Sequence, residues 1–241
     1  MKKLIVPILL LGAAVSAFAQ ISDEAFFRLC ATGTVDNVRN AAAAGANINA
    51  WGEIKDADGF TSYYTCLMIA CKNENVEVVD FLLDNGAKPN PHSREYPMHY
   101  VVNWERSDRA TVKRMIQKLH MRGADIDART TNGLTSLLMC AADPAKEDLG
   151  LLLIELGAGV NVRDGEANTP LMVALTSGIN NSIQHQLIDK LISLSANTNA
   201  KNLLGDRAYT ILKKYDKKKS NEITYYSWYW KIQDDYYNAN N

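Results

Sequence analysis

The sequence lacks the residue patterns on which most enzymes and metalloproteins depend. It contains only four histidines and four cysteines, and none of them falls into a zinc-ligand spacing. A glycine-rich phosphate loop and a nucleophile elbow are also missing. Charge of one sign is missing too, because 26 basic side chains face 27 acidic ones, which gives the chain no electrostatic reason to bind nucleic acid. We therefore predict no catalytic residue, no cofactor and no metal site.

A long apolar segment is also lacking, and the first 19 residues instead predict a secretory signal peptide. Lys2 and Lys3 precede an apolar run that spans Leu4 to Leu11, and small residues lead to an A-x-A pattern that ends at Ala19. This run is shorter than the roughly 20 residues that a membrane-spanning helix needs. We expect cleavage after Ala19, no membrane attachment afterwards, and a periplasmic or, alternatively, extracellular protein. Removal of the two lysines would leave a formal charge of −3.

Export would place the cysteines in an oxidising compartment, where an even number of them suggests disulfides. The spacing argues against a bond between Cys66 and Cys71, because five residues correspond to about 140° around a helix and the side chains diverge. Cys30, Cys71 and Cys140 stand at positions where tight helix packing demands a small residue. We expect buried, free thiols.

Two short strings recur along the chain and define a repeat. The first is best preserved at residues 169–175, which read Thr-Pro-Leu-Met-Val-Ala-Leu, and cruder copies lie at 65–71, 96–102 and 135–141. The second is a Gly-Ala-x-x-Asn pattern whose copies start 41, 37, 34 and 38 residues apart. Such spacing is typical of one supersecondary unit with tolerated loop insertions. The five copies of the second string start at Gly45, Gly86, Gly123, Gly157 and Ser195.

Physical requirements explain the residue types in these strings. Thr169 can cap a helix through its hydroxyl, and Pro170 fits the first helical position. Ala174 is small enough for two helices to close on each other. The glycine of the second string supplies a left-handed residue, and the following Asn or Asp is expected to bond locally and shape the turn. Each unit is therefore predicted to be a pair of helices followed by an extended finger.

The two strings together resemble ankyrin repeats. Residues 169–174 resemble the Thr-Pro-Leu-His-x-Ala motif of the inner helix, and residues 75–87 and 149–161 resemble the outer helix with its Gly-Ala-Asp-x-Asn exit. His99 stands at the motif histidine, which in this family usually bonds to backbone near the turn. The resemblance covers roughly residues 22–215. It implies an all-α solenoid of about five helix-turn-helix units with extended finger loops and a C-terminal cap.

The expected organisation has three parts: the signal peptide at 1–19, the repeat domain at 20–215 and an aromatic-rich tail at 216–241. Insertions are expected around residues 62–64, 103–108 and 177–182. We expect the tail to fold back over the last unit, or alternatively to bind a partner. The units are placed at about 22–50, 61–90, 94–127, 132–161 and 166–199, with the cap at 203–215.

The resemblance implies a monomeric, non-catalytic scaffold that binds another protein, and no nucleic acid, on the concave surface of its fingers and inner helices. Trp51 is the best single anchor, because aromatic residues concentrate interface energy, although it could instead pack on its own finger or on Tyr63. The candidate residues lie in the fingers, in the motif-histidine slot and in one insertion. They are Trp51, Glu53, His92, Arg94, Thr131, Asn132, Arg163 and Asp164 in the fingers, Met68 and Met172 in the slot, and Trp104 in the insertion.

Two other functions fit the sequence less well. One is a secreted effector or toxin-related protein that recognises a host or competitor protein through the tail or the concave face. The other is a thiol- or histidine-dependent enzyme that uses Cys66, Cys71 or His99.

Overall fold

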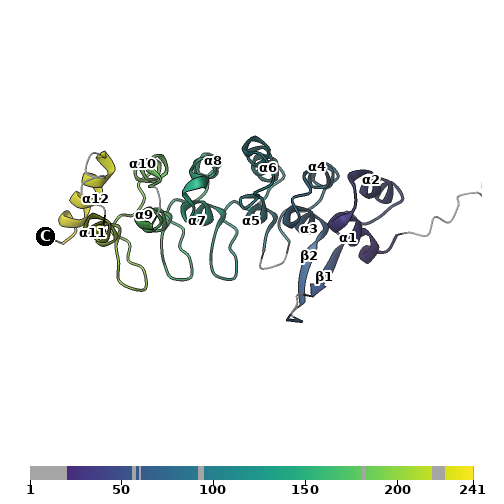
Figure 1. Cartoon of the computed structure of the whole chain (residues 1–241), viewed down its shortest axis with the longest axis horizontal. Helices are drawn as coiled ribbons and strands as arrows, with labels where there is room; N and C mark the ends of the chain where they lie inside the picture. Colours follow the sequence, from purple (N-terminus) through teal and green to yellow (C-terminus); the bar gives the residue numbers. More distant parts are fainter. Residues whose placement is uncertain are drawn as a thin grey trace, which may run out of the picture.

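The computed structural model describes residues 21–55, 58–59, 61–91, 95–180, 183–218 and 226–240, so the expected signal peptide at 1–19 lies outside it. Helices stand in pairs along one line, and fingers project from the row of inner helices (Figure 1). This arrangement confirms the predicted helical repeat solenoid. The inner helices are α1 (Asp23–Thr32), α3 (Cys66–Lys72), α5 (Pro97–Val101), α7 (Ser136–Ala141), α9 (Pro170–Asn180) and α11 (Ala208–Lys218). The outer helices are α2 (Val35–Ala43), α4 (Val76–Asp84), α6 (Arg109–Met121), α8 (Glu147–Glu155), which follows a 3-10 turn at Pro144–Lys146, α10 (His185–Ser193) and α12 (Ser227–Asn238).

Threonine hydroxyls cap the N-termini of the inner helices α3, α7 and α9, as the first string predicts. Thr65, Thr135 and Thr169 each accept a hydrogen bond from the backbone N–H three residues further on, at 3.2, 3.3 and 3.4 Å. Tyr96 stands in this place before α5, and its side chain makes no capping hydrogen bond. Pro97 still occupies the start of that helix, where a missing N–H costs nothing.

Each of the outer helices α2, α4, α6, α8 and α10 is followed by a residue with a positive backbone φ. The angle is 91° at Gly45, 85° at Gly86, 84° at Gly123 and 98° at Gly157. Ser195 adopts the same conformation after α10, with a φ of 60°, which costs energy for a residue with a Cβ. The turn from outer helix to finger therefore explains the recurring glycine.

In the first copy of the Gly-Ala-x-x-Asn pattern the third residue shapes the local turn, and the last residue bonds to the next unit. The sequence interpretation expected local bonds, and Asn47 does accept from the N–H of Asn49 at 3.0 Å. The side chain of Asn49, however, accepts from the N–H of Lys88 at 2.8 Å. Equivalent bonds recur along the array, so the fingers are linked by a ladder. In its further members a side-chain oxygen again accepts a backbone N–H of the next finger: Asn90 accepts that of Asp125 at 2.8 Å, Asp127 that of Gly159 at 3.0 Å and Asn161 that of Asn197 at 2.7 Å.

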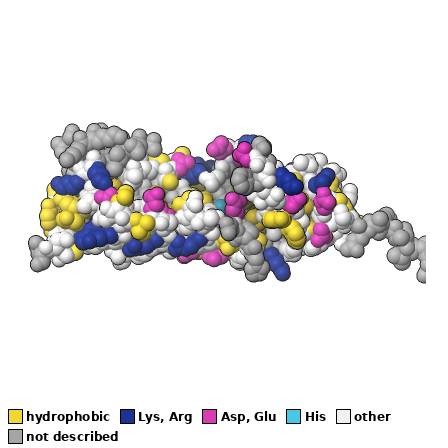
Figure 2. Space-filling model, turned by 90° about the horizontal axis from the view of Figure 1, so that it is seen from below, with side chains coloured by type: hydrophobic (Ala, Val, Ile, Leu, Met, Phe, Trp, Pro, Cys, Tyr) yellow, Lys and Arg dark blue, Asp and Glu magenta, His cyan; other side chains and the backbone are white. Residues whose placement is uncertain are grey.

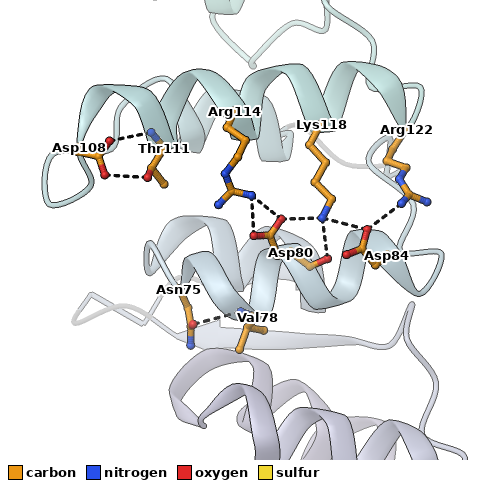
Figure 3. Close-up of polar contacts among 9 residues, drawn as sticks. All are labelled: Asn75, Val78, Asp80, Asp84, Asp108, Thr111, Arg114, Lys118 and Arg122. Atoms are coloured by element: carbon orange, nitrogen blue, oxygen red, sulfur yellow. Dashed lines mark hydrogen bonds and ion pairs between the residues drawn. The ribbon is translucent and has the colours of Figure 1, made fainter.

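Ion pairs join α4 and α6 across the outer row (Figure 3). Asp80 accepts from Lys118 at 2.6 Å and from Arg114 at 2.8 Å, and Asp84 accepts from Lys118 at 3.0 Å and from Arg122 at 2.8 Å. Burial acts to raise the pKa of Asp80, but the hydrogen bonds and charges of Lys118 and Arg114 outweigh it and hold this pKa below its usual range. Basic side chains of α6 are thus occupied within the protein.

The first finger is a β-hairpin, which the all-α prediction did not include. Strand β1 (Trp51–Lys55) pairs antiparallel with β2 (Thr61–Thr65), so that Trp51 lies opposite Thr65. The extra residues that the sequence places before Thr65 belong to β2. Gly52 faces Phe27 of α1, and a Cβ there would lie 2.3 Å from the ring. The hairpin can therefore rest on α1 only because Gly52 has no side chain.

The insertion after α5 folds back over the preceding unit. Trp104 is buried, and its indole N–H donates to the carbonyl of Cys71 at 2.7 Å. Glu74 has a positive φ of 51° and accepts the backbone N–H groups of Glu105 and Arg106 at 2.9 and 3.0 Å. The insertion is thereby tied to the turn between α3 and α4.

Helix α12 lies against α10 and α11, at the end of the array. Trp228 and Ile232 are buried in this contact. The side-chain amide of Asn199, at the ladder position of its finger, donates to the backbone carbonyl of Asp235 at 3.0 Å. The described part of the tail is therefore packed on the last helix pair, as in the first of the two sequence interpretations.

Candidate functional site

A groove of about 800 Å³ runs over the inner helices α7, α9 and α11 and the fingers beside them. Its floor contains Met139, Val173 and Ile211, each of which is the fourth residue of its inner helix. Thr176 lies one helical turn after Val173 and also lines the groove. Three units therefore contribute one continuous surface.

The floor corrects the sequence prediction by one residue. Met68 and Met172 stand in the motif-histidine slot and are buried in the core, so they do not offer side chains to a partner. Successive helix residues are rotated by about 100°. In α9 the next residue, Val173, faces the groove, whereas in α7 the slot residue Leu138 and the next residue Met139 both line it.

The charged residues of the groove are mostly acidic. Asp206 forms an ion pair with Lys214 at 2.7 Å. Asp164 accepts the backbone N–H groups of Glu166 and Asn168 at 2.9 and 2.8 Å, so it mainly shapes its own turn. Glu166 is exposed. The site thus combines an apolar floor with an acidic rim.

The predicted finger residues divide between the groove and the surface next to it. Asp164 lines the groove, whereas Thr131, Asn132 and Arg163 are exposed on the fingers. The carbonyl of Asn132 accepts the N–H of Gly165 at 2.9 Å, which joins two adjacent fingers. These side chains are available to a partner, but only Asp164 is part of the groove itself.

The hairpin carries a second candidate surface. Trp51 is 60% exposed and Tyr63 is 57% exposed, and their rings meet edge to face with centroids 5.7 Å apart. Trp51 therefore contacts Tyr63 and still presents a large apolar area. Glu53 is exposed on the same strand. The hairpin contacts α1 and α3, so this surface is separate from the groove over α7, α9 and α11.

The remaining predicted residues are not part of either surface. Trp104 is buried against the backbone of Cys71, so the expectation that it is available to a partner is wrong. His92 and Arg94 lie outside the described residues, and the insertion expected near residue 180 lies partly outside them.

Sequence reasoning missed two leucines in the finger between α10 and α11. Leu203 is 75% exposed and Leu204 is 84% exposed, and Leu204 lines the groove. Two adjacent leucines between Asn202 and Gly205, both typical of turns, were a visible signal, because such a loop normally carries polar residues. Ile211 and Lys214 were missed because the segment was interpreted only as a cap.

His99 and the four cysteines serve structural roles within the described residues. Nε2 of His99 lies 2.9 Å from the carbonyl oxygen of Ala128, which confirms the expected backbone bond, and burial lowers the pKa of His99. The four cysteines are buried and free, as predicted. Burial raises the pKa of Cys71, and it raises that of Cys140 to about 12, so their reactive thiolate forms are suppressed.

In the described part of the chain, no group of three or more His, Cys, Asp or Glu side chains could hold a metal ion. None of its helices is both long enough and apolar enough to cross a membrane.

Comparison with known proteins identifies the fold. Residues 62–94 match the family described as ankyrin repeat. A putative ankyrin repeat protein of Fowlpox virus (strain NVSL) is 29% identical over 171 residues, which cover 68% of this chain and 46% of the viral protein. The chain thus spans less than half the length of that relative.

Two solved structures extend this likeness to most of the chain. The ankyrin repeat domain of Bcl-3, a member of the IkappaB protein family, has a TM-score of 0.60 at 24% identity, and the match covers 78% of this chain and 76% of that domain's chain. An ankyrin repeat domain from Acinetobacter baumannii AYE has a TM-score of 0.66 at 19% identity, and the match covers 89% of this chain and 97% of that domain's chain. With its paired helices and fingers, the chain has the ankyrin-repeat fold, and residues 62–94 match an ankyrin repeat in sequence.

Proposed function

We propose that this protein is an exported, non-catalytic scaffold that binds another protein in the groove over α7, α9 and α11. Ankyrin repeats generally mediate protein–protein interaction, which supports binding as the activity. The expected signal peptide supports export to the periplasm. The proposal includes a monomer of about five units, closed at its C-terminal end by α11 and α12.

The apolar floor of the groove is the observation on which this proposal depends. Met139 and Val173 are only partly buried on inner helices whose other apolar residues are mostly buried. Leu204 adds an almost fully exposed apolar side chain at the edge. Apolar side chains beside a polar rim are typical of the centre of a protein interface. A partner segment that covers this floor would remove it from water.

The test places a charge in the groove without disturbing the core. Leu204→Glu and Thr176→Glu change exposed side chains, so the fold should persist. Met121→Glu is the matched control, because Met121 is also an exposed apolar residue, at 75%, but lies at the end of outer helix α6. Partners captured from the periplasmic fraction by the unchanged chain are identified, and their affinities for each variant are measured by titration calorimetry.

We expect the groove variants to weaken binding at least about tenfold, because an interface centre tolerates an uncompensated charge poorly. The Met121→Glu protein should bind as the unchanged chain does. Equal binding by all variants would show that the groove is not the site. Weaker binding by the Trp51→Ala protein would then place the binding site on the hairpin.

A further inference from the structure

The fingers carry a row of cations that does not belong to the groove. Arg129, Arg163 and Lys201 each stand two residues after the ladder residue of their unit, and all three are exposed. Figure 2, which looks onto the fingers, shows Lys and Arg side chains in a row along one side of this face. The repeat therefore brings side chains that are 34 and 38 residues apart in the sequence into one line.

Hydrogen bonds hold the two arginines of this row in place. The guanidinium of Arg129 donates to the carbonyl oxygen of Arg163 and, at 3.3 Å, to that of Gly133. The guanidinium of Arg163 donates to the carbonyl oxygen of Lys201 at 3.1 Å. In each case a single terminal nitrogen makes these bonds, so the other N–H groups of the guanidinium can still face outward.

The positive charge of the row is not neutralised by the carboxylates nearby. Asp127 accepts the N–H of Gly159 at 3.0 Å, and Asp164 accepts N–H groups of its own turn. Over the described residues, no ion pair involves Arg129, Arg163 or Lys201. The cations of α6, by contrast, are paired with carboxylates of neighbouring helices (Figure 3).

We infer that this row binds an extended, acidic polypeptide segment that carries an apolar residue at one end. Arginine presents a planar fork of donors that matches a carboxylate, and an ordered row matches carboxylates spaced along an extended chain. Leu203, two residues after Lys201 and 75% exposed, offers an apolar contact at the C-terminal end of the row. This inference rests on the proposed function and names the chemistry of the partner.

The surroundings favour a polypeptide over a nucleic acid or an anionic membrane. Asp164, Glu166 and Asp206 line the groove on the same fingers, and they would repel a continuous polyanion or a charged lipid surface. A polypeptide can place its carboxylates only where the cations are. Three cations are also few for binding through phosphates, which depends on many such contacts.

The test uses the full chain and a fluorescein-labelled peptide in which glutamate recurs along a glycine–serine background that ends in two leucines. A second peptide has glutamine in place of glutamate. The triple variant R129Q/R163Q/K201Q removes the charge but keeps a polar side chain at each of the three positions. Its control, K55Q/K88Q/K190Q, makes the same change in net charge at lysines of the described chain that form no ion pair. Circular dichroism verifies that all variants are folded.

Fluorescence anisotropy should show binding of the acidic peptide that weakens between about 0.05 M and about 0.5 M NaCl, because salt screens exposed charges. The glutamine peptide and the R129Q/R163Q/K201Q protein should each bind roughly tenfold more weakly, while the control stays within about twofold. Equal binding of both peptides, or equal loss in both triple variants, would overturn the inference. So would single-stranded DNA or phosphatidylserine vesicles that bind as tightly as the peptide and lose binding in the same variant.

The two proposals fail in different ways. Loss of the captured partner in the Leu204→Glu protein but not in R129Q/R163Q/K201Q would retain the groove and reject the cationic row. Loss in neither set of variants would reject both.

Discussion

Replacing Trp104 by alanine should destabilise the protein by about 3–5 kcal/mol, the usual cost of truncating a buried aromatic side chain. The structure supports a value in this range, because Trp104 is buried and belongs to the continuous core. Trp104→Phe keeps most of the apolar contact and removes the bond to Cys71. That carbonyl also accepts the N–H of Glu74 at 3.1 Å, so it is not left unpaired, and we expect a loss of only about 1 kcal/mol.

Urea unfolding followed by circular dichroism measures both values. A loss below about 1 kcal/mol in Trp104→Ala would refute the buried position of this side chain. Glu105→Ala is a suitable control, because that side chain is exposed on the same insertion.

Three other predictions follow from local features. Asp80→Asn should be less stable than the unchanged protein at neutral pH, and this difference in unfolding free energy should shrink as the pH falls through the folded-state pKa of Asp80. The reason is that a carboxylate whose pKa is lowered by folding stabilises the protein only above that pKa. Urea titrations at several pH values test this, and a difference that does not change with pH would contradict it. Ser195→Gly should stabilise the chain by about 0.5–1 kcal/mol by relieving a left-handed residue, and a lower urea midpoint would argue against that conformation. Ellman's reagent should react slowly with the native thiols and rapidly in urea, because all four are buried; rapid native labelling would exclude a buried core position.

The helix pairs could be predicted because their signals are local. A threonine that caps a helix and a glycine that takes a positive φ are required by the backbone within a few residues, as at Thr169 and Gly157. Once these signals recur in phase, the repeat and its fold follow. The buried free cysteines and the backbone bond of His99 followed from the same alignment of positions.

The groove could not be placed from the sequence because its floor depends on rotation within very short helices. Helix α7 spans Ser136–Ala141, and nearly all its side chains are buried, so hydrophobic periodicity does not mark the face that remains open. The choice of Met172 instead of Val173 is the resulting error. Trp104 was misplaced for a different reason, because its partner Cys71 is 33 residues away and no local pattern indicates such a contact.

The ladder between fingers has a consequence for how such a chain can change in length. Asn90 accepts a bond from the following unit, while Lys88 of the same unit donates to the preceding one. A unit duplicated or deleted in the interior would therefore find the same complementary groups on both sides. Asn199 donates to the backbone of α12 instead, so the C-terminal end offers no equivalent junction. Lengthening by duplication is compatible with the interior of the array, and engineered arrays should keep the segment from Asn199 to α12 intact.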